Sequence, residues 1–384
     1  MSFPYSLPTT GSLSFADYLE TTAPYSSEIS DATAQRGRLR AVLKELKKEN
    51  QSTRDYQLLI NIIEEYLPYL ISIVNCIETK KLQLKKSIET SWRSTLSDHL
   101  IHTGSNAPRI SCIDIQYELI FVLMTYAYAL SLQVNNDLSK QEPATNKMAD
   151  MLNTAAGVFQ FVANEVIPTW KQSPDNRPVE TVREFPVALS KMALADAQSI
   201  SINRALATNN VSKSLIAKLF IGVAGQYEMA CSLISTLNQD ISTELKKYLA
   251  DGTLFYKALA KKYLAMDAND NQKMGQAVGF ARECKAELNL IHHSSLSKPH
   301  IRKSAIAARA AKEKEAISEL VSKYTMINNT VSYEPVPTRQ ELQKLIPGGR
   351  GLLELKNFVL PDPIFGPSVQ QKSEKSYLLE GRYF

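Results

Sequence analysis

The histidines come nearest, by type and spacing, to a metal site. His99 and His102 stand three residues apart, which places two imidazoles on one face of a helix. A zinc site needs further ligands, and neither a cysteine nor the glutamate of an HExxH motif accompanies the pair. His292 and His293 end a predicted helix, where an imidazolium complements the helix dipole. We interpret these side chains as solvated helix ends and expect neither a metal nor a cofactor.

A glycine-rich stretch over residues 347–351 has the composition of a phosphate-binding loop. It lacks the Lys-Ser/Thr pair that grips phosphate and magnesium, and no strand-then-helix pattern surrounds it. The sequence has no GxSxG nucleophile elbow, and its spacing supports no Cys–His arrangement. It therefore predicts a protein that is not an enzyme.

The four cysteines, Cys76, Cys112, Cys231 and Cys284, are widely spaced among apolar residues. They form no CxxC pair, which favours buried free thiols in a reducing compartment. The first 15 residues contain no basic residue, unlike a secretory signal. The uncharged, mostly apolar stretch over residues 119–134 is shorter than the roughly 20 residues that span a bilayer. We expect a cytoplasmic protein.

The net charge is +5, from 44 basic and 39 acidic residues. This mild excess differs from the concentrated basic stripe of a nucleic-acid-binding protein, so no nucleic acid partner is expected. One predicted helix carries cations that could form a stripe toward anionic lipid or an acidic partner. The alternative is a solvated face balanced by Glu313 and Glu315. The cations are Arg302, Lys303, Arg309, Lys312 and Lys314.

The elements that must position these residues are helical. Only 14 glycines and 17 prolines occur in 384 residues, fewer than hairpins and sandwiches need. Apolar residues recur at helical spacing from Gln35, and Pro68 predicts a kink or break in a helical pattern that continues to Leu96. Further helices are predicted over residues 114–134, 147–170, 182–208, 212–239, 242–267, 271–291 and 297–326.

The remaining segments differ in character. Residues 1–34 predict an extended or short-stranded segment on the body, and residues 171–180 an exposed connection. Residues 331–367 are rich in proline but keep apolar residues, which predicts an ordered, extended cover over the helices. Small residues at helix contacts predict tetratricopeptide-like packing, with the apolar helix 119–134 in its middle.

Several stretches, in matching order, resemble the BRO domain of ALIX-like adaptor proteins. They are Tyr117-Glu118 with the apolar run to Ser131, Ala155 to Phe159, Ala193 to Gln198, Ser214 to Leu219, and the closing positions Tyr333, Val336, Pro337, Leu342, Ile346, Leu353, Lys356 and Pro363. The opening from Phe3 to Thr10, the Pro-Gly-Gly-Arg turn and the aromatic C-terminal end are similar to PalC, the fungal pH-response branch.

This resemblance implies an all-α, curved, tetratricopeptide-like helical solenoid: a single BRO-type domain over residues 1–367 with a C-terminal tail over 368–384. It implies a groove that binds the C-terminal amphipathic helix of an ESCRT-III filament subunit. The family's groove residues carry over to Lys147, Ser201 or Ile202, Leu215 and Leu219. Where the family has an aromatic, this sequence has Ser201. Leu215 and Leu219 share one helix face, and the alternative is that both are core leucines.

The expected function is a scaffold in fungal ambient-pH signalling, recruited from the cytoplasm to plasma or endosomal membrane. ESCRT-III and other pH-signalling components are its expected partners. Three alternatives remain open: a membrane-surface module with a basic convex face, an endosomal sorting adaptor, and an enzyme with an unrecognised site. Vesicle binding that weakens with salt would indicate the first alternative, and a deep polar pocket with perturbed carboxylates the last.

Overall fold

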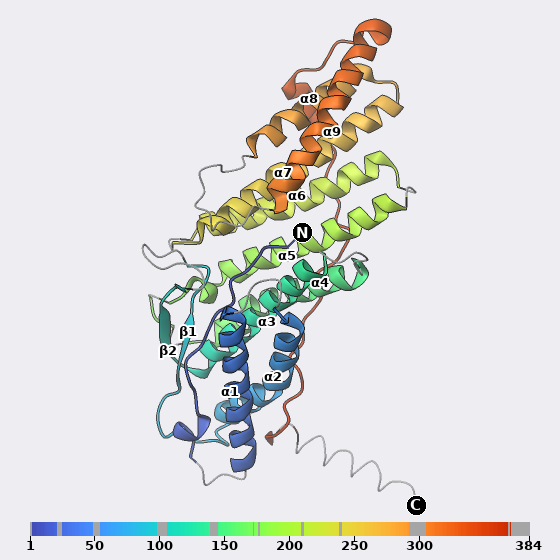
Figure 1. Ribbon diagram of the computed structural model, residues 1–384. Coiled ribbons are helices and arrows are strands. Elements are labelled where there is room, and N and C mark those ends of the chain that lie inside the picture. The colour runs from blue at the N-terminus through green and yellow to red at the C-terminus, as the bar shows by residue number, and fades with distance from the viewer. Residues whose placement is uncertain are drawn as a thin grey trace, which may run out of the picture.

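The computed structural model describes residues 2–20, 25–48, 54–97, 106–138, 145–171, 173–175, 177–208, 211–237, 240–291, 305–367 and 369. These residues form an elongated stack of helices, with one small sheet at its side (Figure 1). The long helices are α1 (Ser26–Lys48), α2 (Tyr56–Glu78), α3 (Ile115–Asp137), α4 (Thr145–Phe161), α5 (Glu184–Ala207), α6 (Lys213–Ser235), α7 (Thr243–Asp270), α8 (Met274–Leu290) and α9 (Ala305–Ile327).

The predicted break at Pro68 is wrong, because α2 runs through this proline to Glu78. The hydroxyl of Ser72 donates to the Pro68 carbonyl, 2.7 Å away. The prediction of helix up to Leu96 is also wrong, since the chain leaves α2 and forms strand β1 (Glu89–Arg93). Helix α1 begins at Ser26, earlier than the apolar spacing indicated.

Strand β1 pairs in antiparallel fashion with β2 (Arg109–Ile113). On the other side of β1, the Gly11 amide donates to the Ser91 carbonyl, and Thr10 bridges to Trp92. The N-terminal segment thus extends this sheet, as its predicted short-stranded character requires. It also inserts aromatic rings into the core, where Tyr5 stacks on Tyr128 of α3.

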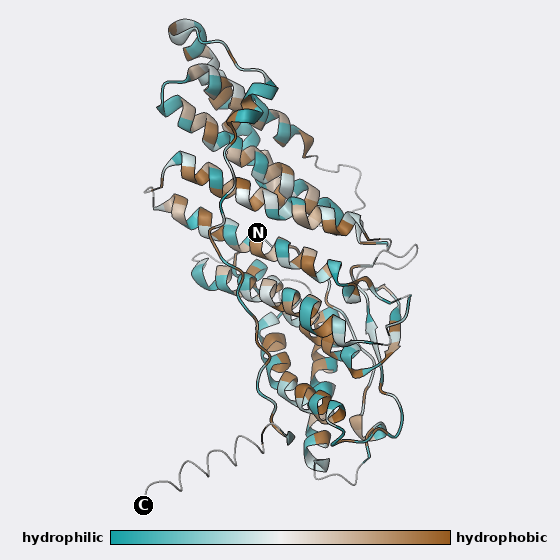
Figure 2. Cartoon of the chain, turned by 180° about the vertical axis from the view of Figure 1, so that it is seen from behind, coloured by the Kyte–Doolittle hydropathy of each residue, from teal (hydrophilic) through white to brown (hydrophobic). Residues whose placement is uncertain are grey.

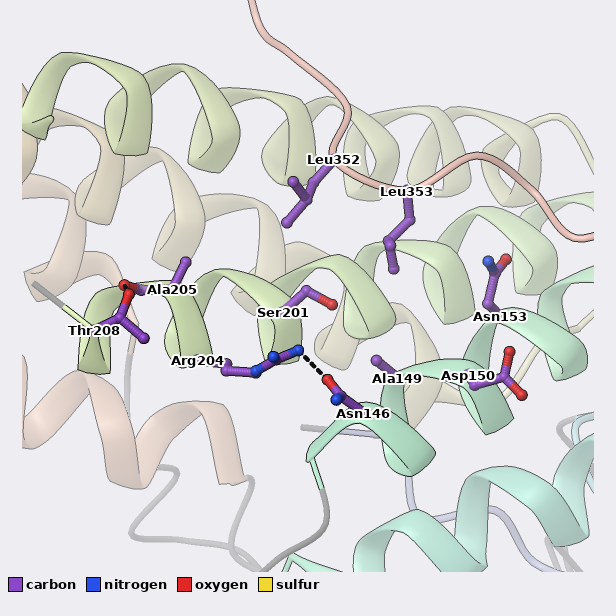
Figure 3. Close-up of a pocket in the computed structure, with 10 residues that line it drawn as sticks. All are labelled: Asn146, Ala149, Asp150, Asn153, Ser201, Arg204, Ala205, Thr208, Leu352 and Leu353. Carbon is purple, nitrogen blue, oxygen red and sulfur yellow. Dashed lines mark hydrogen bonds between the residues drawn. The ribbon is translucent and has the colours of Figure 1, made fainter. Parts of the chain in front are cut away.

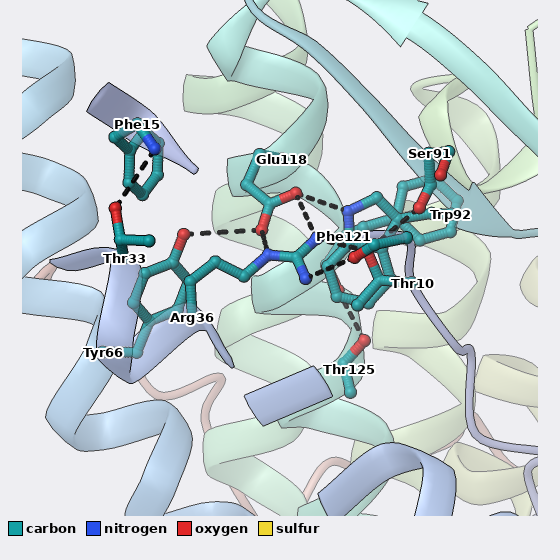
Figure 4. A network of polar contacts seen from close by, with 11 residues as sticks. Thr10, Phe15, Thr33, Arg36, Tyr66, Ser91, Trp92, Glu118, Phe121 and Thr125 are labelled. Carbon is teal, nitrogen blue, oxygen red and sulfur yellow. Dashed lines mark hydrogen bonds and ion pairs between the residues drawn. The ribbon is translucent and has the colours of Figure 1, made fainter. Parts of the chain in front are cut away.

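A buried ionic network ties this segment to α1, α2 and α3 (Figure 4). The guanidinium of Arg36 lies 2.7 Å from the Glu118 carboxylate, and both side chains are buried. The Trp92 indole N–H donates to the same carboxylate at 2.7 Å. Arg36 also donates to the Gly11 carbonyl and to the Thr10 hydroxyl. Every strong polar group here has a partner, which is what a low-dielectric interior requires.

Helix α3 is the centre of this half of the molecule, as its apolar sequence predicted. Asp114 caps it by accepting a hydrogen bond from the Gln116 amide. Two helices, α2 and α3, are long and apolar enough to cross a membrane, but 61% and 100% of their most apolar windows are buried in the fold. Both are therefore explained as core helices.

From α4 to α9, each helix packs on the next one along the chain. This neighbour-by-neighbour packing is that of the predicted solenoid. Helix α4 continues into a π turn (Val162–Val166) and a 3-10 turn (Ile167–Thr169). The connection predicted to be exposed is so at Lys171 and Asp175, but its end turns inward at a 3-10 turn (Val179–Thr181). There Glu180 is buried and accepts from the Ser94 hydroxyl and the Leu96 amide.

The predicted C-terminal cover is an extended strap, defined here as residues 333–367 and interrupted by α10 (Arg339–Leu345). Figure 2 shows it crossing the stacked helices toward α2. Its backbone lies directly on three helices at positions where only glycine fits. A Cβ on Gly157, Gly222 or Gly275 would lie 2.2 to 2.3 Å from a strap carbonyl oxygen. Sequence-distant glycines thus seat the strap against α4, α6 and α8.

Candidate functional site: a groove between two helices and the strap

A pocket of about 500 Å³ lies between α4, α5 and the strap (Figure 3). Helix α5 forms its floor, α4 one wall, and the strap leucines Leu352 and Leu353 point toward α5 from the other side. Leu352 is 44% exposed, so much of its side chain is open to a ligand in the pocket. The remaining lining residues are Asn146, Ala149, Asp150, Asn153, Ser201, Arg204, Ala205 and Thr208.

The strap is held at this pocket by polar contacts to α4. Asn153 donates to the Glu354 carbonyl at 2.9 Å and accepts from the Lys356 amide at 3.0 Å. The Lys356 ammonium lies 3.0 Å from the Asp150 carboxylate. On α6, the Lys218 carbonyl accepts from the Arg350 amide at 2.9 Å. Because the strap is pinned on both sides of Leu352 and Leu353, these leucines form a fixed wall.

Cations outnumber anions at the rim of this pocket. Arg204 donates to the Asn146 side chain, and Lys147 is exposed next to Asn146. Among the described residues, neither cation takes part in an ion pair. Asp150 is neutralised by Lys356. The pocket therefore combines an apolar wall with an unneutralised positive rim, which suits an amphipathic ligand with acidic side chains.

The structure separates the predicted groove residues. Ser201 lines the pocket, whereas Lys147 does not line it and is exposed next to the lining residue Asn146. Ile202 does not line the pocket and is completely buried in the core, so it is not a groove residue; this part of the prediction is wrong. On α6, Leu215 is half-buried and Leu219 only 4% exposed, and neither lines the pocket. Both pack against the core, beside the turn on which the strap lies.

The predicted basic stripe is only partly described. Arg302 and Lys303, like all five histidines, lie outside the described residues. Lys312 is exposed on α9, as a stripe would require. The guanidinium of Arg309 instead lies over the Phe255 ring, 5.2 Å from its centroid, and this corrects its assignment to the surface. Lys314 donates to the Ile291 carbonyl.

The buried titratable groups do not converge on the pocket. Burial raises the pKa of Asp196 to about 6, while the hydroxyls of Tyr227 and Tyr248 donate to it. Burial also raises the pKa of Glu180. Both carboxylates are at most 1% exposed, so no substrate can reach them. Among the described residues, no group of three His, Cys, Asp or Glu side chains could hold a metal ion.

The cysteines are free thiols, as the sequence predicted, with Cys231 half-buried and the others buried. Burial raises the pKa of Cys112 to about 11 and that of Cys284 to about 12. At neutral pH these groups are protonated thiols and poor nucleophiles.

The strap leucines and Arg204 were missed by sequence reasoning. Leu353 and Lys356 appeared only as positions in the closing pattern, and Leu352 not at all. The available signal was the frequency of apolar residues in a proline-rich segment. It indicated that the segment packs, but not that Leu352 stays exposed beside the pocket.

The stacked helices, the small sheet and the strap define the class of the protein. The BRO1-like domain model matches residues 12–353, and the chain belongs to this family. The fold agrees with that of the ALIX BRO1 domain solved in complex with CHMP4C, at a TM-score of 0.71 and 16% identity over 94% of this chain and 96% of the other. The prediction of a mostly helical BRO-type fold is confirmed.

Two curated fungal relatives are similar over almost their whole length. The pH-response regulator protein palC of Cryptococcus neoformans is 26% identical over 99% of both chains. The pH-response regulator protein palC of Yarrowia lipolytica is 23% identical over 100% of both chains. The predicted resemblance to the PalC branch is thereby confirmed.

Proposed function

We propose that this chain is a non-catalytic scaffold of fungal ambient-pH signalling. It binds the C-terminal amphipathic helix of an ESCRT-III filament subunit in the groove between α4, α5 and the strap. The observation that carries this proposal is the exposed Leu352 beside a positive rim. An amphipathic helix would place apolar residues on the leucine wall and acidic residues near Lys147 and Arg204.

Two comparisons support the proposal from outside the chain. The structural neighbour was solved with CHMP4C, and the full-length relatives are named pH-response regulators. Such a scaffold would be cytoplasmic and would reach plasma or endosomal membrane through the filament, where further pH-signalling components would meet it. The carboxylates of Asp196 and Glu180 are buried where no substrate can reach them, so they give no support to a catalytic role.

The contact should be reversible. A leucine buried against a partner gains about 1.5–3 kcal/mol gross, and ordering the two surfaces reduces this. An affinity around micromolar, about 8 kcal/mol, is therefore expected. Leu215 and Leu219 would act indirectly, by supporting the turn of α6 on which the strap lies.

The test is fluorescence anisotropy with a labelled peptide of the filament subunit's C-terminal helix. Leu352→Asp should weaken binding at least about tenfold, because it places a charge on the apolar wall. The matched control is Leu58→Asp, at a leucine of α2 that is 45% exposed. Unchanged binding by Leu352→Asp, or equal loss in both variants, would remove the groove assignment. Leu219→Asp is unsuitable, because a charge at a buried position unfolds the protein as readily as it blocks a site.

A further inference from the structure

The walls that α4 and the strap give to the pocket continue into a second, smaller cavity. This recess of about 150 Å³ lies between the end of α4, its π turn and strap residues 355–357. Leu355 on its strap side is 37% exposed, just as Leu352 is exposed beside the pocket. A helix bound along α4 and the strap would therefore meet both cavities.

In the pocket, the acceptor oxygens are already engaged. The side-chain oxygen of Asn146 accepts from Arg204. Asp150 accepts from the Lys356 ammonium at 3.0 Å, and Asn153 accepts from the Lys356 amide at 3.0 Å. The groups that remain open to a ligand at this end are the cations of the rim, which favour acidic side chains on the ligand.

In the recess, by contrast, acceptor oxygens are open to a ligand. The Glu165 carboxylate is exposed and forms no ion pair with any of the residues that the structure describes. The side-chain amides of Gln160 and Asn357 also line the recess and make no hydrogen bond within that part of the chain. One negative charge and two amide oxygens together favour a donor that carries positive charge.

The cations next to the recess are engaged elsewhere. Lys356 lines the recess, but its ammonium lies 3.0 Å from the Asp150 carboxylate. Arg183, at the start of α5, donates to Asn164 at 3.1 Å and forms no ion pair among the described residues. A basic group of a ligand would thus be able to pair with Glu165 without displacing a cation of this chain.

We propose that the recess binds a basic side chain of the same helix that occupies the pocket. This inference rests on the proposed function and adds the direction in which the helix lies. The Glu165 carboxylate would accept from a lysine or arginine of the ligand, with Gln160 and Asn357 as further acceptors. Leu355 would contact the aliphatic stem of that side chain.

Helix geometry gives the spacing of charges that the ligand needs. Arg204 is bonded to Asn146 near the start of α4, and Glu165 lies in the π turn at its end. The residues between Asn146 and Glu165 cover at most about 28 Å, at roughly 1.5 Å each, and a ligand helix covers this distance in about five turns. A ligand with acidic residues at one end and a basic residue at the other fits in one direction only, because the reverse direction brings like charges together.

The test uses the labelled filament helix in the anisotropy assay at low ionic strength. Glu165→Gln keeps the shape of the side chain and removes its charge, so binding should weaken about threefold to fivefold, as for an exposed ion pair. The loss should shrink as salt is added. The matched control is Glu354→Gln, which removes the same charge from an exposed strap residue that lines neither cavity and should bind like wild type.

A charge exchange identifies the ligand residue. Glu165→Lys should weaken binding at least about tenfold, since it replaces an attraction by a repulsion. The basic residues of the peptide are then replaced by glutamate one at a time. One of these peptides should bind Glu165→Lys more tightly than it binds wild type, and its replaced residue should lie about five turns from the acidic residues.

The outcomes separate this inference from the proposed function. Unchanged affinity in Glu165→Gln, while Leu352→Asp still weakens binding, would overturn the inference and leave the groove in place. Equal losses in Glu165→Gln and Glu354→Gln would also overturn it, because they would indicate diffuse attraction by net charge. The same holds if no peptide prefers Glu165→Lys. Wild-type chain that binds no peptide would overturn the proposed function and this inference together.

Discussion

The two halves of the molecule handle a buried carboxylate in opposite ways. In the α1–α3 half, Glu118 pairs with a buried guanidinium and also accepts from an indole. In the α4–α9 half, Asp196 of α5 accepts from two tyrosine hydroxyls of α6 and α7 and has no ion-paired cation among the described residues. In the first arrangement the carboxylate stays charged, and its cation and its hydrogen bonds offset the cost of removing that charge from water. The second leaves a carboxyl group whose charge is disfavoured.

The difference matches how each half is built. The α1–α3 half joins segments far apart in the chain, because Arg36 and Glu118 are 82 residues apart. A directional ionic contact there can select one arrangement of α1, α3 and the N-terminal segment; we offer this as a hypothesis about specificity. The α4–α9 half stacks sequence neighbours, whose order needs no such selection. The strap connects distant parts of this half by close packing of its backbone against helix glycines.

The largest expected effect comes from breaking the ionic pair on one side. Arg36→Met leaves Glu118 buried without its cation, and the free energy of unfolding should fall by about 3–5 kcal/mol. Urea unfolding followed by circular dichroism measures this change. Arg38→Met is the control on the same helix: its partner is Glu65, both side chains are more than half exposed, and the loss should stay below about 1 kcal/mol.

Adding Glu118→Leu to Arg36→Met sharpens the comparison, since replacing both charges by apolar side chains should recover much of the stability. Similar losses in Arg36→Met and Arg38→Met would mean that the buried pair has no special energetic role. In that case the contrast between the two halves would be one of composition only.

A smaller, pH-dependent effect is expected at Asp196. Its pKa in the folded state is about 6, above the ordinary 3.8, so the folded state holds the proton more tightly than the unfolded state does. The resulting stabilisation is present below about pH 4 and is lost as the pH rises through 6. Asp196→Asn cannot ionise. Relative to this variant, wild type should lose up to about 3 kcal/mol between pH 4 and pH 7.

Unfolding curves at several pH values measure this loss, with the exposed Asp31→Asn as the control that should follow wild type at every pH. A constant difference between wild type and Asp196→Asn across the range would contradict the assignment of this carboxyl group. The two halves would then treat their carboxylates alike.

Much of the fold could be predicted because helical periodicity is local. The helix from Asp114, its position in the core, and the start of α6 at Ser212 follow from apolar spacing and capping residues. The sheet could not be predicted in this way, because β1 and β2 are short and are held by contacts between separate segments of the chain, including the N-terminal one. The buried Glu180 was missed for a similar reason: its partners, Ser94 and Leu96, are more than 80 residues away.

The groove shows the same limit. The family resemblance led to Ser201, which lines the pocket, and to Lys147, which does not line it and whose role stays a prediction. Ile202 was a wrong choice between two neighbours on one helix, since their side chains point in different directions and that of Ile202 is buried. The leucine wall depends on where the strap crosses α5, and this is decided by contacts between residues 153 and 356 and between residues 218 and 350. Such contacts leave no periodic trace in one sequence. That residues 1–367 fold as a single unit stays a prediction.

The smallest expected effect concerns the fit of the strap on α6. A methyl group on Gly222 would lie 2.3 Å from the Arg350 carbonyl oxygen, and backbone cannot move away as a flexible side chain does. Gly222→Ala should therefore cost about 1–2 kcal/mol of stability and displace the strap near Leu352. Gly225→Ala, on the same helix, meets nothing within 4 Å and should stabilise the chain by roughly 0.5–1 kcal/mol through helix propensity alone. If the strap is seated as described, thermal unfolding should show a lower stability for Gly222→Ala and a higher one for Gly225→Ala.

Because Leu352 belongs to the displaced segment, Gly222→Ala should also weaken binding of the filament helix in the anisotropy assay, whereas Gly225→Ala should not. Equal stabilisation by both alanines would mean that the strap yields without cost and cannot act as a fixed wall.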